Sequence, residues 1–152
     1  MKQLTGLLVL CILLAGCEIK VTTPPLPAIA GTWQLLTGTI IEKTDTVITD
    51  YTKDKKFIKI ISGNHFSFLG HDLNGGADST TAFFAAGGGS YTLKDSTYTE
   101  HLEFCNDRAW EKHDFTFTVS VNGDTLVQSG TEVVEATGIN RLNIEKYVRV
   151  KK

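Results

Sequence analysis

The stretch that decides the fold is residues 87–105, Gly-Gly-Gly-Ser-Tyr-Thr-Leu-Lys-Asp-Ser-Thr-Tyr-Thr-Glu-His-Leu-Glu-Phe-Cys. Apolar and polar side chains alternate on both sides of Asp95-Ser96, and these two residue types are common in turns. Alternation with a period of two is typical of a β-strand that is covered on one face. Residues 87–105 therefore predict a β-hairpin whose apolar face is covered by other strands.

Strand-like segments flank this hairpin on both sides. Before it, strands are expected at residues 32–41, 57–61, 65–69 and 80–85, and after it at 115–121, 125–129 and 143–150. Asn122-Gly123 favours a type I′ turn, which fixes the pairing of its two neighbouring strands. Closing such a meander removes the two free edges that would invite aggregation. We predict an all-β fold, an antiparallel meander closed into a lipocalin-like β-barrel of about 8–10 strands.

Length and composition limit the classes of protein to consider. The chain has 152 residues, enough for one domain, and its 41% hydrophobic and 21% charged residues are ordinary for a globular protein. The formal net charge is −2, and lysine and arginine are scattered along the chain. A protein that binds nucleic acid needs a basic surface to neutralise phosphates. We therefore expect no nucleic-acid partner.

The N-terminus has the pattern of a targeting signal. Lys2 precedes an apolar run from Leu4 to Leu14, which is shorter than the roughly 20 residues that span a bilayer. The run ends in Leu14-Ala15-Gly16-Cys17. This ending resembles the lipobox of bacterial lipoproteins, and the resemblance implies that residues 1–16 are a signal peptide and that Cys17 is lipidated. A plain secretory signal with an incidental cysteine is the alternative.

The lipoprotein resemblance also implies a place in the cell. Residues 17–30 would form the lipidated cysteine and a tether that holds all three prolines, followed by a barrel domain at 31–152. Two or more acyl chains give stable attachment, so the membrane is an expected partner through Cys17. Glu18 stands where inner-membrane retention would favour Asp, which points to the outer membrane of a Gram-negative cell envelope.

Both ends of the predicted barrel carry a second resemblance. Gly31-Thr32-Trp33 is similar to the Gly-x-Trp motif of lipocalins and their calycin relatives, in which an arginine of the last strand packs over the tryptophan. Arg149 is the matching arginine. The segments 65–68 and 88–104 resemble small secreted bacterial lipocalin-like proteins of largely unassigned activity. The resemblance implies that Trp33 and Arg149 close one end of a barrel.

The period of two predicts which side chains face the interior. Glu100 falls on an inward face, where a carboxylate needs a partner, water or a ligand. A ligand contact is one interpretation, and a buried pair with Arg149, Lys59 or a tyrosine hydroxyl is the other. The candidate walls for a small apolar ligand are Phe66, Phe68, Tyr91, Tyr98, Leu102, Phe104 and Phe117, with Glu100 as the polar contact. The alternative is a filled barrel in a structural or partner-binding envelope lipoprotein.

The sequence gives little support for a metal site, a reactive cysteine or a catalytic serine. His101 and Glu103 share an outward face and would need His65 or His113 to complete a zinc site, so we predict no metal and no cofactor. Cys105 is the one cysteine left after processing, which rules out an intrachain disulfide, and we expect an inert buried thiol. There is no Gly-x-Ser-x-Gly motif. We therefore predict a binding protein and no catalytic residues.

Overall fold

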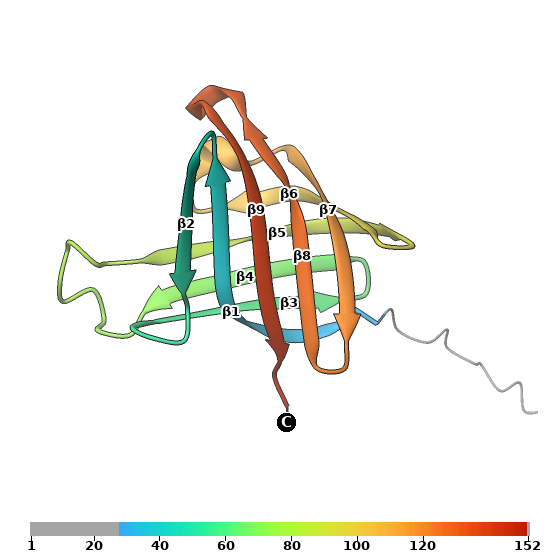
Figure 1. Cartoon of the computed structure of the whole chain (residues 1–152), viewed down its shortest axis with the longest axis horizontal. Coiled ribbons are helices and arrows are strands. Elements are labelled where there is room, and N and C mark those ends of the chain that lie inside the picture. The colour runs from blue at the N-terminus through green and yellow to red at the C-terminus, as the bar shows by residue number, and fades with distance from the viewer. Residues whose placement is uncertain (1–27, 152) are drawn as a thin grey trace, which may run out of the picture.

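The structure, a computed structural model, describes residues 28–151, and the predicted signal peptide and Cys17 lie outside this range. The regular secondary structure of the described chain is almost entirely β-strand, as predicted, with two short 3-10 helices (Figure 1). The strands are β1 (Gly31–Glu42), β2 (Asp45–Asp50), β3 (Lys55–Ser62), β4 (His65–Asp72), β5 (Phe84–Lys94), β6 (Thr97–Cys105), β7 (His113–Asn122), β8 (Thr125–Val134) and β9 (Ile139–Arg149); the 3-10 helices are η1 (Arg108–Trp110) and η2 (Glu135–Thr137).

The strands pair antiparallel, and the sheet closes on itself. From β3 to β9 each strand pairs with the next one along the chain. β1 completes the ring because it pairs with β3 through residues 31–34 and with β9 through residues 33–41. The result is a closed antiparallel barrel of eight strands, which confirms the predicted fold class. β2, which the sequence did not reveal, pairs with β1 and with no other described strand.

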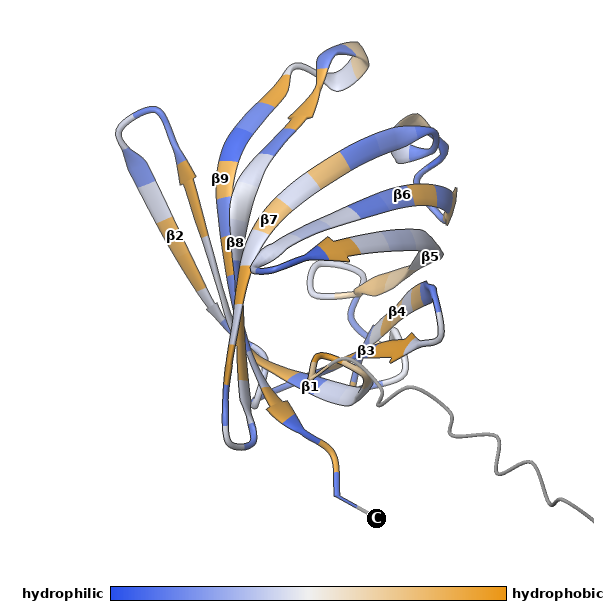
Figure 2. Ribbon diagram, turned by 90° about the vertical axis from the view of Figure 1, so that its right-hand side faces the viewer, coloured by the Kyte–Doolittle hydropathy of each residue, from blue (hydrophilic) through white to orange (hydrophobic). Residues whose placement is uncertain are grey.

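β1 bends where its partners change. Its first residues pair with β3, and its residues 37–42 pair with β2 instead. The register with β9 shifts between Leu35 and Thr37, and the intervening Leu36 carbonyl accepts a hydrogen bond of 2.9 Å from the backbone of Tyr51. A bulge of this kind bends a strand. The bend lets β1 join the wall of β8 and β9 to the wall of β3 to β5, which lies opposite in Figure 2.

One end of the barrel is closed by Trp33. The indole is fully buried, and its Nε1 donates a hydrogen bond of 2.7 Å to the carbonyl of Ile29. The guanidinium of Arg149 lies 4.0 Å from the centre of the Trp33 ring and donates to the carbonyl of Ala30 at 2.7 Å. This is the packing that the lipocalin resemblance implies. The turns at 63–64, 95–96 and 123–124 lie at the closed end, and the longer connections 73–83, 106–112 and 135–138 lie at the other.

Side chains facing the barrel interior fill its closed half. Alternate residues of β7 face inward, as predicted from the spacing of Phe115, Phe117 and Val119. The same alternation buries Tyr91 on β5 and Tyr98 on β6. The buried apolar core is Ile29, Trp33, Leu35, Ile61, Phe66, Tyr91, Tyr98, Leu102, Phe115, Phe117, Val119, Leu126, Val134 and Tyr147.

Phe104 does not face the interior, so the expectation that it forms a ligand wall is wrong. Its side chain is 68% exposed on the outside of the barrel. The cause is a β-bulge: Gly88 pairs with Phe104 and Gly89 pairs with Leu102, so Glu103 is an extra residue in β6. One extra residue reverses the inside–outside alternation that follows it.

Two further expectations on local structure are wrong. Residues 80–83 form part of a loop and not a strand, because the Asp72 carboxylate accepts hydrogen bonds from the backbone of Gly76 at 2.7 Å and of Phe83 at 2.9 Å. The Asn122-Gly123 segment makes a hairpin, as predicted, but Asn122 pairs with Thr125 and remains in the strand. Of the two loop residues, Gly123 alone has a positive φ, 57°, which is the pattern of a type II′ turn.

Replacing Gly123 with alanine is expected to destabilise the barrel. An L side chain in this left-handed conformation costs about 1–2 kcal/mol, so the free energy of unfolding should fall by about that amount in urea denaturation. Gly123→Asn is the control, because asparagine tolerates this region better and should lose less. Equal losses for the two variants would contradict the backbone explanation.

Candidate functional site

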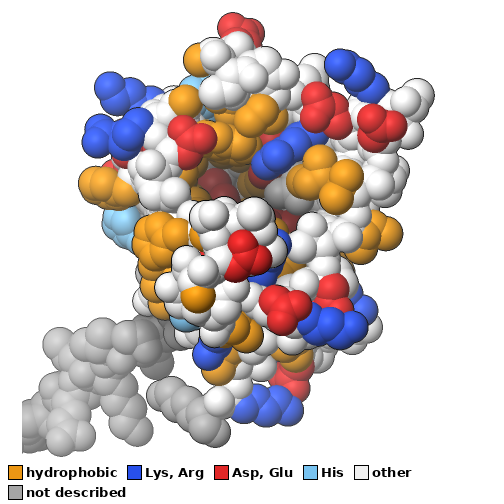
Figure 3. Space-filling view, turned by 90° about the vertical axis from the view of Figure 1, so that its left-hand side faces the viewer, with side chains coloured by type: hydrophobic (Ala, Val, Ile, Leu, Met, Phe, Trp, Pro, Cys, Tyr) orange, Lys and Arg blue, Asp and Glu red, His pale blue; other side chains and the backbone are white. Residues whose placement is uncertain are grey.

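The barrel interior is hollow toward the end that carries the longer connections. A cavity of ≈ 290 Å³ lies there, and the face shown in Figure 3 is hollowed, with acidic side chains visible inside the hollow. Cavities that hold small ligands have volumes of roughly 300–1,000 Å³, so this one is close to the lower end of that range and suits only a small molecule. Its apolar wall comes from β3, β4, β6, η1 and β7, and consists mainly of Phe57, Phe68, Leu102, Trp110, Phe115 and Phe117.

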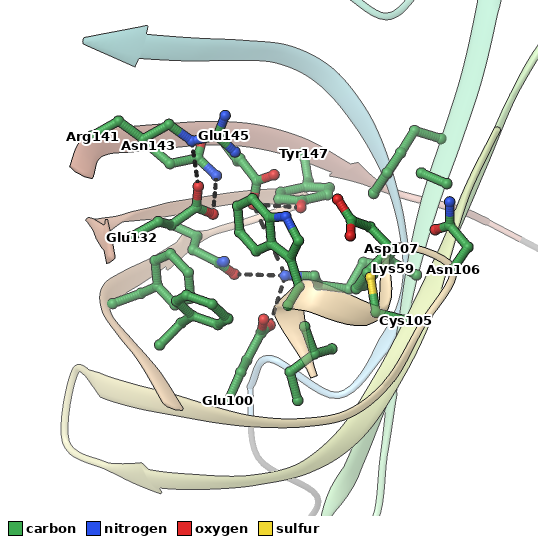
Figure 4. A pocket seen from close by; sticks show the side chains of 18 residues that line it. Lys59, Glu100, Cys105, Asn106, Asp107, Glu132, Arg141, Asn143, Glu145 and Tyr147 are labelled. Carbon is green, nitrogen blue, oxygen red and sulfur yellow. Dashed lines mark hydrogen bonds and ion pairs between the residues drawn. The ribbon is translucent and has the colours of Figure 1, made fainter. Parts of the chain in front are cut away.

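The opposite wall is polar and comes mainly from β8 and β9. Arg141, Asn143, Glu145 and Tyr147 are spaced two residues apart on β9, so they share the inward face. β8 adds Gln128 and Glu132. Figure 4 shows Arg141 and Asn143 bonded to Glu132, and Lys59 between Glu100 and Glu145. The cavity therefore has one aromatic side and one hydrogen-bonding side.

Lys59 joins the two sides at the bottom of the cavity. Its Nζ donates hydrogen bonds to Glu100 Oε1 at 2.7 Å and to Gln128 Oε1 at 3.1 Å, and it lies 3.9 Å from Glu145 Oε2. The Lys59 side chain is 4% exposed and that of Glu100 is 8% exposed. The buried pair that the sequence left open for Glu100 is therefore present, and its partner is Lys59.

The ammonium is also surrounded by aromatic rings. Lys59 Nζ lies 5.8 Å from the centre of the Phe66 ring, 6.0 Å from that of Phe117 and 5.7 Å from that of Tyr147. Ring faces carry partial negative charge and attract cations. The carboxylates, the amide oxygen of Gln128 and the three rings all favour a positive charge on Lys59.

Burial and neighbouring charges together raise the pKa values of Lys59, Glu100, Tyr98 and Tyr147. Burial alone would lower the pKa of Lys59, but the carboxylates of Glu100 and Glu145 outweigh it and raise the pKa. Burial raises the pKa of Glu100, and Glu145 adds to the rise, while Lys59 opposes it. Burial also raises the pKa of Tyr98 and Tyr147, so both are neutral phenols. Two carboxylates thus share a single ammonium.

A second ion pair lies closer to the mouth. Glu132 accepts hydrogen bonds from Arg141 Nε and from Asn143 Nδ2, each at 2.8 Å. The Arg141 guanidinium lies over the ring of Trp110, 5.1 Å from its centre. Both oxygens of Glu132 are therefore occupied by partners of the protein itself, and Arg141 is paired and stacked.

The structure separates the predicted ligand contacts into three groups. Phe68, Glu100, Leu102 and Phe117 line the cavity. Phe66, Tyr91 and Tyr98 lie in the packed core, where the Tyr91 hydroxyl donates to the Gly63 carbonyl at 2.9 Å, and the Tyr98 hydroxyl has no hydrogen-bond partner among the described residues. Phe104 lies outside.

Sequence reasoning missed most of the polar wall. Hydrophobic alternation identifies faces that are dry, and the inward face of β9 carries Arg141, Asn143 and Glu145 before Tyr147. The sequence did contain a signal for the polar wall. Arg141, Asn143 and Glu145 continue the two-residue spacing of Tyr147 and Arg149, and Arg149 was predicted to close the barrel. On the apolar wall, Phe57, Trp110 and Phe115 also belong to the site.

The remaining candidate residues lie outside the cavity or at its edge. His101 Nδ1 lies 2.7 Å from Asp114 Oδ1 on the outer surface, and Glu103 accepts a hydrogen bond from the Ser90 hydroxyl at 2.9 Å. Within residues 28–151, no three His, Cys, Asp or Glu side chains converge as metal ligands would. Cys105 is half-buried at the cavity edge, and burial raises the pKa of its thiol.

Fold and site together define a closed antiparallel β-barrel with an internal cavity, consistent with a lipocalin-like fold. Protein-family models give no match to the sequence, and a search of curated proteins finds no significant relative. In residues 28–151, no helix has the length and hydrophobicity needed to cross a bilayer.

Replacing Lys59 with methionine should destabilise the protein strongly, because it leaves the buried Glu100 without its partner. Removing one member of a buried ion pair costs about 3–5 kcal/mol, measurable by urea denaturation. Lys56→Met, on the exposed face of the same strand, is the matched control and should change stability little. Adding Glu100→Gln to Lys59→Met should recover part of the loss, and no recovery would contradict the pairing argument.

Proposed function

We propose that this protein is a lipid-anchored envelope protein that binds or carries a small, largely apolar molecule inside its barrel. The observation that carries the proposal is the cavity of ≈ 290 Å³, which has an aromatic wall and a wall of hydrogen-bonding groups. Pockets that bind small molecules combine apolar walls with a few placed polar groups in this way. The apolar part of the ligand would lie against Phe57, Phe68 and Phe115.

The polar wall supports binding more than it supports a purely structural role. A barrel that needed only stability could fill its interior with apolar side chains, because a buried ion pair is often no more stable than well-packed apolar residues of similar volume. Here Lys59, Glu100 and Glu145 are inward-facing, and they line the cavity. A ligand with a polar group accounts for both the charges and the space beside them.

The lipid anchor is supported by the sequence around Cys17, and the structure gives it a compatible arrangement. The described chain enters the barrel at its closed end, where Arg149 bonds the carbonyls of Ala28 and Ala30. The cavity opens between connections at the opposite end. The start of the described chain and the mouth of the cavity are therefore at opposite ends of the barrel.

A partner-binding role is the second candidate, and an outer apolar patch favours it. Phe84 on β5 and Leu69 on β4 are both exposed, and they border the same hollow on the outer surface. Exposed apolar side chains on a monomer often mark an interaction surface. In this case the cavity would be a by-product of barrel closure, and substitutions that fill it would have no functional effect.

A tryptophan in place of Ala85 is expected to block the cavity. Ala85 lines the cavity, whereas its neighbour Ala86 borders a hollow on the outer surface, so Ala86→Trp is a matched control. The neutral fluorescent probe N-phenyl-1-naphthylamine should bind the wild-type protein and Ala86→Trp alike, and at least about tenfold more weakly to Ala85→Trp. Equal probe binding by all three proteins would sink the proposal that the cavity is the binding site.

Lipidation can be tested on the cysteines. In a Gram-negative host, Cys17→Ser should release the protein from the membrane fraction, because the acyl chains that hold it there are attached to that residue. Cys105→Ser should stay in the membrane fraction. Fractionation and intact mass of the mature protein measure both effects, and a wild-type mass without acyl groups would contradict the anchor.

A further inference from the structure

We infer that the ligand of the cavity is an organic cation, an amine with an apolar body whose ammonium lies beside Glu145. This inference rests on the proposed binding function and names the chemical class of the ligand. It follows from the balance of charges around the cavity and from the hydrogen bonds that those charges already make.

The cavity lining carries more negative than positive charge. The charged residues that line it are the cations Lys59 and Arg141 and the carboxylates Glu100, Asp107, Glu132 and Glu145. Asp107 is exposed at the mouth, where its side chain accepts a hydrogen bond from the backbone of Ala109 at the start of η1. Leaving Asp107 aside, two cations face three carboxylates. When all three carboxylates are ionised, one negative charge inside the barrel is without a full counter-charge.

Glu145 is the carboxylate that is left over. Glu132 is paired with Arg141, and Glu100 holds the hydrogen bond from Lys59. Glu145 accepts a hydrogen bond of 2.8 Å from the neutral hydroxyl of Tyr147, and its nearest cation is Lys59 Nζ at 3.9 Å. A carboxylate in a low-dielectric interior gains most from a directly bound cation. The ammonium of a ligand would supply it.

The opposite wall suits the rest of such a ligand. Phe57, Trp110 and Phe115 border the same volume as Glu145, and aromatic faces attract cations as well as covering apolar groups. An anionic ligand would find no unpaired cation in the described lining, because Lys59 and Arg141 are already paired with Glu100 and Glu132. The arrangement therefore favours a cation over a neutral molecule, and a neutral molecule over an anion.

A matched series of three probes tests this order. Each is a naphthalene ring with a different substituent at the same position: an aminomethyl group that is protonated at neutral pH, a neutral hydroxymethyl group or a carboxylate. Isothermal titration calorimetry with the purified protein should show the ammonium probe binding at least about tenfold more tightly than the alcohol, and the carboxylate most weakly.

The variant Glu145→Gln should remove the preference, so that the ammonium probe binds no more tightly than the alcohol. Glu103→Gln, which removes the same charge from the outer surface, should keep the preference. If Glu145→Gln does not fold, as judged by its thermal unfolding, the order of the three probes on the wild-type protein still decides. Binding of the alcohol without a preference for the ammonium would overturn the cation assignment and leave the cavity function standing. Failure of all three probes to bind would overturn both.

Discussion

The buried ammonium of Lys59 holds the open half of the barrel together. It comes from β3 and reaches Glu100 on β6, Gln128 on β8 and Glu145 on β9, so one side chain joins four strands across the interior. In a barrel without central packing at that level, such a link limits how far the walls can move apart. Because the charge is taken out of water, its partners have to be fixed in number and place.

The two halves of the barrel divide the tasks of stability and binding. A cavity lowers stability, since the side chains around it lose packing contacts. The closed half offsets that loss with Trp33 under Arg149 and a dense group of tyrosine, phenylalanine and aliphatic side chains. Charged residues lie where the packing ends. The site is thus supported by a rigid element, as binding groups have to be to keep their geometry.

The sequence was most informative where the interior is dry. Alternation along β7 correctly gave the inward direction of Phe115 and Phe117, and the two ends of the chain gave the pair that closes the barrel, Trp33 and Arg149. The alternation gave the wrong direction for Phe104. A bulge adds one residue to β6 just before it, and the hydrophobic pattern of the preceding residues does not reveal the bulge. The polar wall was missed for a related reason, since Arg141 and Glu145 face inward but carry no apolar signal. Spacing left Lys59 as one of three possible partners of Glu100, and the pairing of distant strands in the closed ring decides among them.

β2 can detach from β1 while the rest of the barrel stays folded, because of its position at the edge of the sheet. β2 is held by β1 alone among the described strands, and Asp45 and Asp50 place a charge at each end of its free edge. Charges on an edge strand discourage pairing with another chain. Detaching β2 breaks one ladder and leaves the ring of eight strands closed, so its free energy of opening is smaller than that of global unfolding. Amide hydrogens of β2 that bond to β1 will therefore exchange with solvent faster than those of β8, which is paired on both sides.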